Sequence, residues 1–184
     1  MSYDFVSLLD QNIKTIIGKE QKHHWKESFS GIKPILELQD QNGTILGQFQ
    51  NDKKSHNEYT LFNSDKDIVL QLSVYGPSPK KVEIRDSEYD FLARVESKRL
   101  GKTSFFLRNS NDETILQGKG KSWKSNSLEV KDKKENIVAE WNPKIRGPWV
   151  LNLHDSIIDR ILVLGFILGI ITLSPYVFEA TGVT

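Results

Sequence analysis

The stretch Leu36-Glu-Leu-Gln-Asp-Gln-Asn-Gly-Thr-Ile-Leu-Gly, residues 36–47, shows the unit from which most of this chain is built. Apolar and polar residues alternate up to Asp40, and a second apolar pair follows at residues 45–46. Alternation with a period of two is typical of a half-buried β-strand, and the Asp-Gln-Asn-Gly sequence favours a tight turn. The stretch therefore predicts a β-hairpin.

The same pattern occurs six times at a constant spacing of 23 residues. In each copy an aspartate or asparagine follows apolar residues that lie two and four positions earlier. These turn residues are Asp40, Asn63, Asp86, Asn109, Asp132 and Asp155. A fixed period indicates a repeated structural unit, so we interpret the chain as tandem hairpins. Each turn residue stands largely alone in its hairpin, whereas Ca²⁺ needs about six to eight converging oxygens. We therefore assign these residues to turns.

The sixth copy departs from the pattern after its turn residue. Residues 156–173 are strongly apolar and precede Ser174-Pro175, so they predict a helix instead of a second strand. Five complete hairpins, a first strand expected at residues 21–27 and a last strand at 149–154 bring the total to twelve strands. Near the N-terminus, residues 2–18 place apolar side chains along one helical face and predict a short amphipathic helix.

The apolar C-terminal segment has two possible interpretations. The 18 residues from Ile161 to Phe178 carry no charge, which is about the shortest length that spans a membrane, and Gly165 and Gly169 have the spacing found in associating membrane helices. Alternatively, the protein itself encloses the helix. Twelve strands tilted by about 40° close into a barrel of about 12 Å radius, and one helix, about 10–12 Å across, fills it. We favour the enclosed helix, and the membrane anchor remains the alternative.

The sequence thus predicts a mainly β fold in a single domain, residues 1–184. We expect a twelve-stranded closed antiparallel barrel of tandem hairpins, with its strands between residues 21 and 154, around a central hydrophobic C-terminal α-helix at 156–173. The short N-terminal amphipathic helix at 2–18 precedes the barrel.

Composition argues against several classes of function. The chain has 25 basic and 24 acidic residues, a balance that does not suggest nucleic-acid binding. It has no cysteine, which excludes disulfides and thiolate chemistry, and its four histidines do not form a metal-ligand pattern. Neither a phosphate-binding glycine-rich loop nor a Gly-x-Ser-x-Gly elbow occurs. We therefore expect no enzymatic activity, cofactor or metal.

The repeated hairpins resemble those of a known superfamily. Residues 36–47 and the copy Val82-Glu-Ile-Arg-Asp-Ser-Glu-Tyr-Asp-Phe-Leu-Ala, together with the apolar C-terminal helix, are similar to tubby C-terminal domains, phospholipid scramblases and plant LURP-one-related proteins. The resemblance covers residues 21–178 and implies a twelve-stranded barrel around a central helix. Its members include phosphoinositide-binding proteins and proposed lipid scramblases.

The chain departs from the scramblase pattern in ways that bear on function. It lacks the Pro-rich N-terminal region and the cysteine cluster of scramblases. Only Asp155 and Asp159 are acidic in residues 151–159, where scramblases carry their proposed calcium segment. The resemblance therefore does not extend to calcium-triggered lipid scrambling.

Charge is distributed unevenly between the two kinds of loop. In such a barrel the turns within hairpins lie at one end, and the connections between hairpins lie at the other. Acidic residues predominate in the turns and basic residues in the connections. The candidate lipid- or anion-binding residues, which we call the basic rim, are Lys80, Lys81, Lys98, Arg99, Lys102, Lys119, Lys121, Trp123, Lys124, Lys144 and Arg146.

A basic rim suggests a partner that carries negative charge. Each nearby lysine or arginine contributes about 1 kcal/mol to attraction by an anionic membrane, and Trp123 would add an interfacial aromatic side chain. Charged strand ends are also well solvated, so a rim without a binding role is the competing interpretation. We expect a binding module for anionic phospholipid surfaces or phosphorylated ligands, without a nucleic-acid partner.

Two other functions remain open at this stage. One is a scramblase-like or tail-anchored membrane protein that uses the C-terminal helix, and the other is a protein-interaction or structural barrel. The N-terminal sequence lacks the basic region and cleavage site of a signal peptide. We therefore expect the protein in the cytoplasm, where it could bind peripherally to a membrane.

Overall fold

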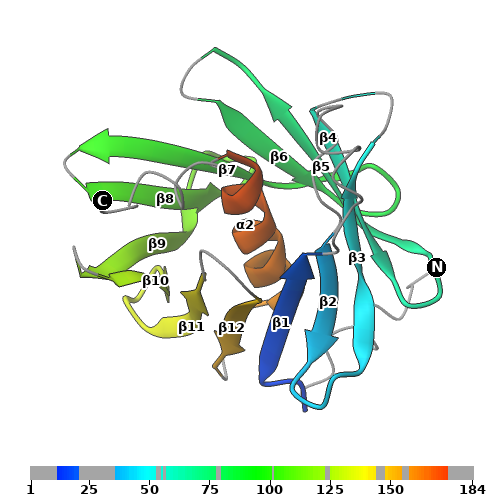
Figure 1. Cartoon of the computed structure of the whole chain (residues 1–184). Coiled ribbons are helices and arrows are strands. Elements are labelled where there is room, and N and C mark those ends of the chain that lie inside the picture. Colours follow the sequence, from blue (N-terminus) through cyan, green and yellow to red (C-terminus); the bar gives the residue numbers. More distant parts are fainter. Residues whose placement is uncertain are drawn as a thin grey trace, which may run out of the picture.

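Twelve strands form one closed antiparallel barrel, and a helix lies inside it (Figure 1). The computed structural model describes residues 12–20, 36–52, 55, 57–77, 80–100, 102–122, 125–143, 148–154 and 158–173. Strands that follow one another in sequence are neighbours in the sheet, and pairing of the first strand with the last closes the barrel. The predicted class, the number of strands and the central helix are confirmed.

The elements have the following bounds. The strands are β1 (Thr15–Glu20), β2 (Leu36–Asp40), β3 (Ile45–Asn51), β4 (Glu58–Asn63), β5 (Ile68–Tyr75), β6 (Lys81–Arg85), β7 (Phe91–Leu100), β8 (Lys102–Arg108), β9 (Thr114–Ser122), β10 (Ser125–Asp132), β11 (Ile137–Asn142) and β12 (Trp149–Leu153). The helix is α2 (Arg160–Leu173).

The five hairpin turns share one construction. In the first, Oδ1 of Asp40 accepts hydrogen bonds from the backbone N–H groups of Asn42 and Thr44, both at 2.8 Å. In the other four, the side-chain oxygen of the turn residue accepts a hydrogen bond from the backbone N–H four positions later, at 2.8–2.9 Å. Each hairpin also has a register shift beside its turn. The five turn residues therefore have the role that the sequence predicted.

The third position after each turn residue adopts a positive φ. It is Gly43 in the first turn, with φ of +84°, and Lys66 in the second, with φ of +70°. Tyr89, Asp112 and Glu135 occupy the same position in the remaining turns, with φ of +73°, +64° and +64°. Because a Cβ makes this region unfavourable, four of the five turns carry a local conformational cost.

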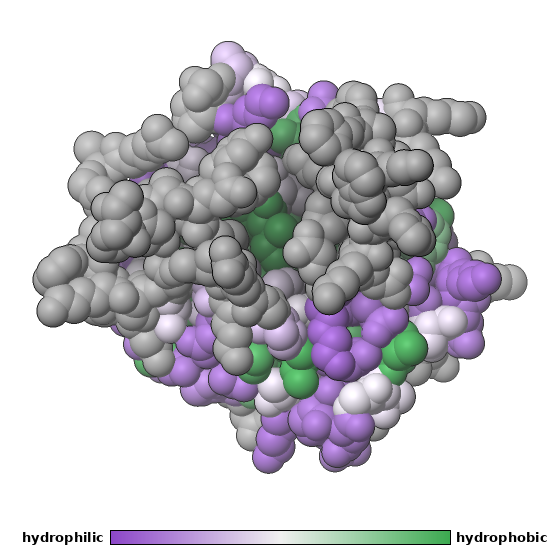
Figure 2. Space-filling view, viewed as in Figure 1, coloured by the Kyte–Doolittle hydropathy of each residue, from purple (hydrophilic) through white to green (hydrophobic). Residues whose placement is uncertain are grey.

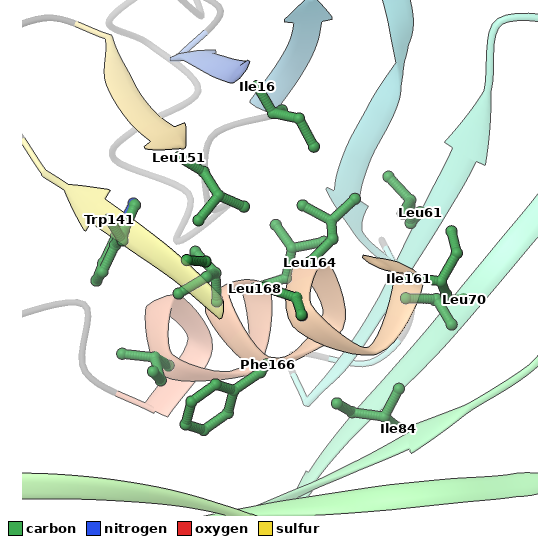
Figure 3. Packing of buried hydrophobic residues seen from close by; sticks show 14 of the residues in the cluster. Ile16, Leu61, Leu70, Ile84, Trp141, Leu151, Ile161, Leu164, Phe166 and Leu168 are labelled. Atoms are coloured by element: carbon green, nitrogen blue, oxygen red, sulfur yellow. The ribbon is translucent and has the colours of Figure 1, made fainter. Parts of the chain in front are cut away.

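The helix α2 fills the barrel. Leu164, Phe166, Ile167 and Leu168 are 0% exposed. Figure 3 shows Leu164 and Leu168 among apolar side chains of the wall, including Ile16 and Leu151. Burial decreases in the last turn of α2. In Figure 2, apolar surface is visible in a hollow where α2 lies in Figure 1. No helix in the described part of the chain is long and apolar enough to cross a membrane.

Two glycines allow α2 to approach the wall closely. A Cβ on Gly169 would lie 2.6 Å from Cγ2 of Val95, a separation that real Cβ atoms do not reach. A Cβ on Gly165 would lie 3.2 Å from Cδ1 of Leu70. The spacing that resembled a membrane-helix motif therefore serves packing between the helix and the barrel wall.

The predicted start of the C-terminal helix, residue 156, is wrong. Residues 158–159 are not helical, α2 begins at Arg160, and residues 155–157 lie outside the described residues. The Oδ1 atom of Asp159 accepts a hydrogen bond from the backbone N–H of Ile161 at 2.9 Å. Asp159 therefore caps the helix, because its carboxylate satisfies a backbone donor that has no partner within the helix.

The N-terminal prediction also needs correction. The amphipathic helix predicted at 2–18 overlaps β1, and its residues 2–11 lie outside the described part of the chain. Ile16 lies opposite Asp40 on one side and Leu151 on the other, and it is 0% exposed. Pairing with two strands that are distant in sequence therefore outweighs the helical periodicity. The first strand predicted at 21–27 lies outside the described residues.

Because the third position of each turn has a positive φ, introducing a glycine there and replacing one there should change the free energy of unfolding in opposite directions. We expect Lys66→Gly to raise the free energy of unfolding by up to about 1 kcal/mol, because glycine adopts a positive φ without a Cβ clash. Gly43→Ala should lower it by about 1 kcal/mol, although no atom lies within 4 Å of the added Cβ. Urea unfolding measures both effects, and two changes of the same sign would contradict this explanation.

The enclosed helix makes Leu168 a sensitive position. Leu168→Ala should cost about 2–5 kcal/mol. Leu168→Asp should unfold the protein, because an unpaired buried charge costs several kcal/mol against a typical total stability of about 5–15 kcal/mol. Circular dichroism during urea unfolding checks this, with Ile137→Asp as a control at a side chain that is 37% exposed. A Leu168→Asp variant that kept wild-type stability would contradict burial of α2.

Candidate functional site

The two ends of the barrel differ in chemistry. All neighbouring strands are antiparallel, so the five turns gather at one end, which we call the turn end. The links β3–β4, β5–β6, β7–β8, β9–β10 and β11–β12 gather at the opposite end, which we call the connection end. The members of the basic rim that the structure describes belong to the connection end.

Two hairpins extend further than the others at the connection end. Pairing of β7 with β8 continues to Leu100 and Lys102, and pairing of β9 with β10 continues to Ser122 and Ser125. Gly118 of β9 is buried, whereas Gly120, which follows it on the same face, is exposed. These hairpins therefore continue past the core as two arms, residues 97–100 with 102–104 and residues 119–122 with 125–127. In Figure 1 the β7–β8 arm extends away from α2.

The arms bring two of the predicted cations close together. Lys98 of β7 and Lys119 of β9 both lie opposite Ser104 of β8. Two strand spacings separate their backbones, which is about 10 Å. Both side chains are exposed, and Nζ of Lys98 lies 5.4 Å from the centre of the Phe106 ring. This cation–π contact holds the Lys98 ammonium group beside the strand, and the residue as a whole remains exposed.

The other predicted residues fall into three groups. Lys80 is exposed and adjoins the start of β6, and Lys81 is the first residue of β6. Arg99, Lys102 and Lys121 belong to the strands of the arms, but their side chains lie outside the described part of the structure. Trp123, Lys124, Lys144 and Arg146 lie outside the described residues altogether.

A cluster around Glu96 was not anticipated from the sequence. The Glu96 carboxylate lies 2.9 Å from Nζ of Lys81, 2.8 Å from Nε of Arg94 and 3.4 Å from Nε of Arg108. Asp112 also contacts both arginines, at 2.5 Å and 3.5 Å. We call these five residues the Glu96 cluster. The alternating charges of Arg94, Glu96 and Lys98 on the outer face of β7 suggest ion pairs along this strand. They do not identify the partners of Glu96 on β6 and β8.

The Glu96 cluster changes the electrostatics of the basic rim. Burial of Glu96 favours its neutral form, but the hydrogen bonds and charges of Lys81 and Arg94 outweigh burial and lower the pKa of this carboxyl group. Glu96 therefore stays ionised and compensates the charge of Lys81. Among the rim side chains that the structure describes, the exposed cations are Lys80, Lys98 and Lys119.

No metal-binding cluster accompanies these cations. Within the described residues, no three His, Cys, Asp or Glu side chains lie together as potential metal ligands. The ammonium groups of the exposed lysines can attract anions and donate hydrogen bonds to them.

The lowered pKa of Glu96 predicts a pH-dependent contribution to stability. At pH 7, Glu96→Gln should reduce the free energy of unfolding by about 1–3 kcal/mol, because Lys81 loses its charged partner and the two arginines keep only Asp112. A lowered pKa means that this contribution is complete above the ordinary carboxyl pKa of 4.5 and is lost as pH falls through the lower folded-state value. Urea unfolding of both proteins at pH 7 and pH 3 tests this.

A matched substitution separates the cluster from a general charge effect. Glu129 lies 4.0 Å from Lys131, and this is a longer single contact. Glu129→Gln should therefore change stability by less than about 1 kcal/mol. If the difference between wild type and Glu96→Gln were the same at pH 7 and pH 3, ionisation of Glu96 would not be its cause.

The comparisons with known proteins support the fold and do not extend to activity. No protein-family model matches the chain, and a search of curated proteins found no match. The chain is similar in structure to a protein from Arabidopsis thaliana, AT5G01750, whose X-ray structure aligns with a TM-score of 0.56 at 19% sequence identity. The alignment covers 85% of this chain and 90% of the Arabidopsis protein. At this identity the likeness shows a shared fold over almost the whole of both chains.

Proposed function

We propose that this protein is a non-enzymatic module that binds anionic phospholipid surfaces or phosphorylated ligands through the connection end of its barrel. Phosphate is the chemistry that these ligands share. The observation that carries the proposal is the set of exposed lysines at this end, Lys80, Lys98 and Lys119, two of which lie on the projecting arms. At the turn end the exposed acidic residues that the structure describes, such as Asp65, Asp90 and Glu113, outnumber the exposed lysines.

The separation of charge explains how a nearly neutral chain can bind an anionic surface. With a net charge of +1, the protein as a whole is attracted only weakly. Screening at physiological salt limits the reach of an exposed charge to about 8–10 Å, so the end nearest the membrane determines the interaction. The basic rim would face the membrane, while the turn end would lie beyond the screening distance.

The arms suit a flat target better than a deep pocket. They are two adjacent hairpins that continue beyond the core, and both carry cations on their strands. A planar membrane can contact both arms at once, which sums small contributions of about 1 kcal/mol per cation. The sequence resemblance to the tubby, scramblase and LURP-one-related superfamily supports the same proposal, because phosphoinositide-binding proteins belong to it. We include membership of that superfamily in the proposal.

The alternative in which the C-terminal helix works within a membrane is less well supported. To enter lipid, α2 would have to leave the barrel and expose the wall residues around it, including Leu61, Ile84 and Leu151, all of which are 0% exposed. Burial of such side chains contributes about 1.5–3 kcal/mol each, so the transition would remove most of the core. A barrel that binds only proteins remains as an outcome of the test below.

Charge reversal at the connection end tests the proposal. The variant Lys80→Glu, Lys98→Glu, Lys119→Glu should fold normally, because all three side chains are exposed. Its binding to anionic vesicles should weaken by about 3 kcal/mol or more, which is at least about a hundredfold. Wild-type binding should itself fall steeply as salt increases. Co-sedimentation with phosphatidylcholine vesicles, with and without phosphatidylserine or a phosphoinositide, measures both effects.

A second triple variant controls for net charge. Lys14, Lys66 and Lys134 are also exposed but lie at the turn end, and their reversal to glutamate changes the net charge by the same amount. This control should retain vesicle binding. Equal loss in both variants, or equal binding of the first variant and wild type, would refute a role for the basic rim. Titration with a soluble inositol phosphate then separates binding of a free phosphorylated ligand from binding of a lipid surface.

A further inference from the structure

A groove of about 440 Å³ lies on the outer face of β4, β5 and β6, where it opens to solvent. Its lining combines hydroxyl groups, two carboxylates, one guanidinium and two tyrosines. The lining residues are Ser55, Asn57, Glu58, Ser73, Val74, Tyr75, Glu83, Arg85 and Tyr89. A volume of this size is within the usual range for ligand pockets, about 300–1,000 Å³.

The sheet register sets the two carboxylates on opposite sides of the groove. Glu58 of β4 lies opposite Ser73 of β5, and Ser73 lies opposite Glu83 of β6. The backbones of the two glutamates are therefore about 10 Å apart, with a serine between them. Tyr75 follows Ser73 by two positions on the same face of β5, so it is a diagonal neighbour of Glu58.

One half of the groove already holds a guanidinium group. Nη2 of Arg85 lies 2.6 Å from Oε2 of Glu83, and its guanidinium carbon lies 4.8 Å from the centre of the Tyr89 ring. Nη1 of Arg85 also donates a hydrogen bond to the backbone carbonyl of Tyr89 at 3.1 Å. A carboxylate, an aromatic face and a carbonyl together form a favourable environment for a planar cation.

The other half offers the same kinds of group, namely a carboxylate, a hydroxyl group and an aromatic ring. Glu58 is exposed, and it forms no ion pair within the described part of the chain. Tyr75 is 37% exposed, although aromatic side chains of this size are usually more deeply buried. Lys81 lies opposite Tyr75, but its ammonium group lies 2.9 Å from Glu96. Among the described residues no cation forms an ion pair with the carboxylate of the half formed by Glu58, Ser73 and Tyr75, and we call this half the open half.

We propose that the open half binds an arginine side chain of a partner protein. The carboxylate of Glu58 supplies the opposite charge, and the ring of Tyr75 supplies the face on which a guanidinium stacks, as Glu83 and Tyr89 do for Arg85. Arginine fits better than lysine, because its planar group pairs with a carboxylate and stacks on an aromatic ring at the same time. This site takes a cation, so it is independent of the anion binding proposed for the connection end.

Chemical-shift titration of the ¹⁵N-labelled protein tests this assignment directly. The probe is the peptide Gly-Ser-Arg-Ser-Gly with blocked ends, and the comparison peptides carry citrulline or lysine in place of arginine. The arginine peptide should shift the backbone amides of Glu58, Ser73 and Tyr75. Citrulline has nearly the same shape without charge, so its Kd should be at least tenfold higher, and the lysine peptide should bind less tightly than the arginine peptide.

Variants of the open half provide the second measurement. Glu58→Gln and Tyr75→Leu should each raise the Kd of the arginine peptide at least fivefold. The matched control is Asp65→Asn, which removes an exposed carboxylate at the turn end. It should leave the Kd unchanged. Vesicle binding by Glu58→Gln should equal that of wild type, so failure of this site and failure of the basic rim can be told apart.

Several results would overturn the assignment. Equal affinity for the arginine and citrulline peptides would show that charge is not recognised. Equal affinity for arginine and lysine would exclude a site specific for guanidinium. Shifts confined to residues outside the groove, or an unchanged Kd in Glu58→Gln, would place any binding elsewhere. The comparison of peptides uses only the wild-type protein, so it remains decisive if a variant fails to fold.

Discussion

The rest of the structure depends on the need to surround an apolar helix completely. Because α2 has no polar face, burial of only one side would leave side chains such as Phe166 and Ile167 in water. A closed sheet with a lumen as wide as one helix meets this need, and twelve strands provide it. Closure in turn requires β1 to bridge β2 and β12. Burial of α2 and pairing of β1 with β2 and β12 therefore depend on each other.

The repeated turn is the local device that makes such a barrel possible. The side-chain oxygen of the turn residue, the positive φ three positions later and the register shift occur together in all five hairpins. They fix which residues face inward, since a slip of one residue would turn every side chain to the other face. The same register gives the outer face its rows of polar side chains, such as Glu58, Ser73 and Glu83 across three strands. By fixing the register, the turns also determine which side chains lie next to one another on the outer face.

The sequence predicts structure well where the interacting residues are close together in the chain. It predicts structure poorly where the interacting residues are distant in the chain. The period of 23 residues predicts the hairpins because each turn is formed by neighbouring residues. Residues 13–17 suit a helix and a strand equally well, and only β2 and β12 decide between them. The role of Lys81 depends on Glu96, which is fifteen residues away and on the next strand. The basic rim could therefore be proposed from the sequence, whereas the groove could not.

Glu96 helps to keep two surfaces of opposite sign apart. Lys81 lies between the open half of the groove and the β7–β8 arm, opposite Tyr75 and within ion-pair distance of Glu96. A lysine stem is long enough to point either way, and a carboxylate held by three cations fixes its direction. If Lys81 turned instead toward Glu58, it would occupy the place that we assign to a partner's arginine. The Glu96 cluster therefore directs Lys81 away from Glu58, while Lys98 and Lys119 remain exposed on the arms.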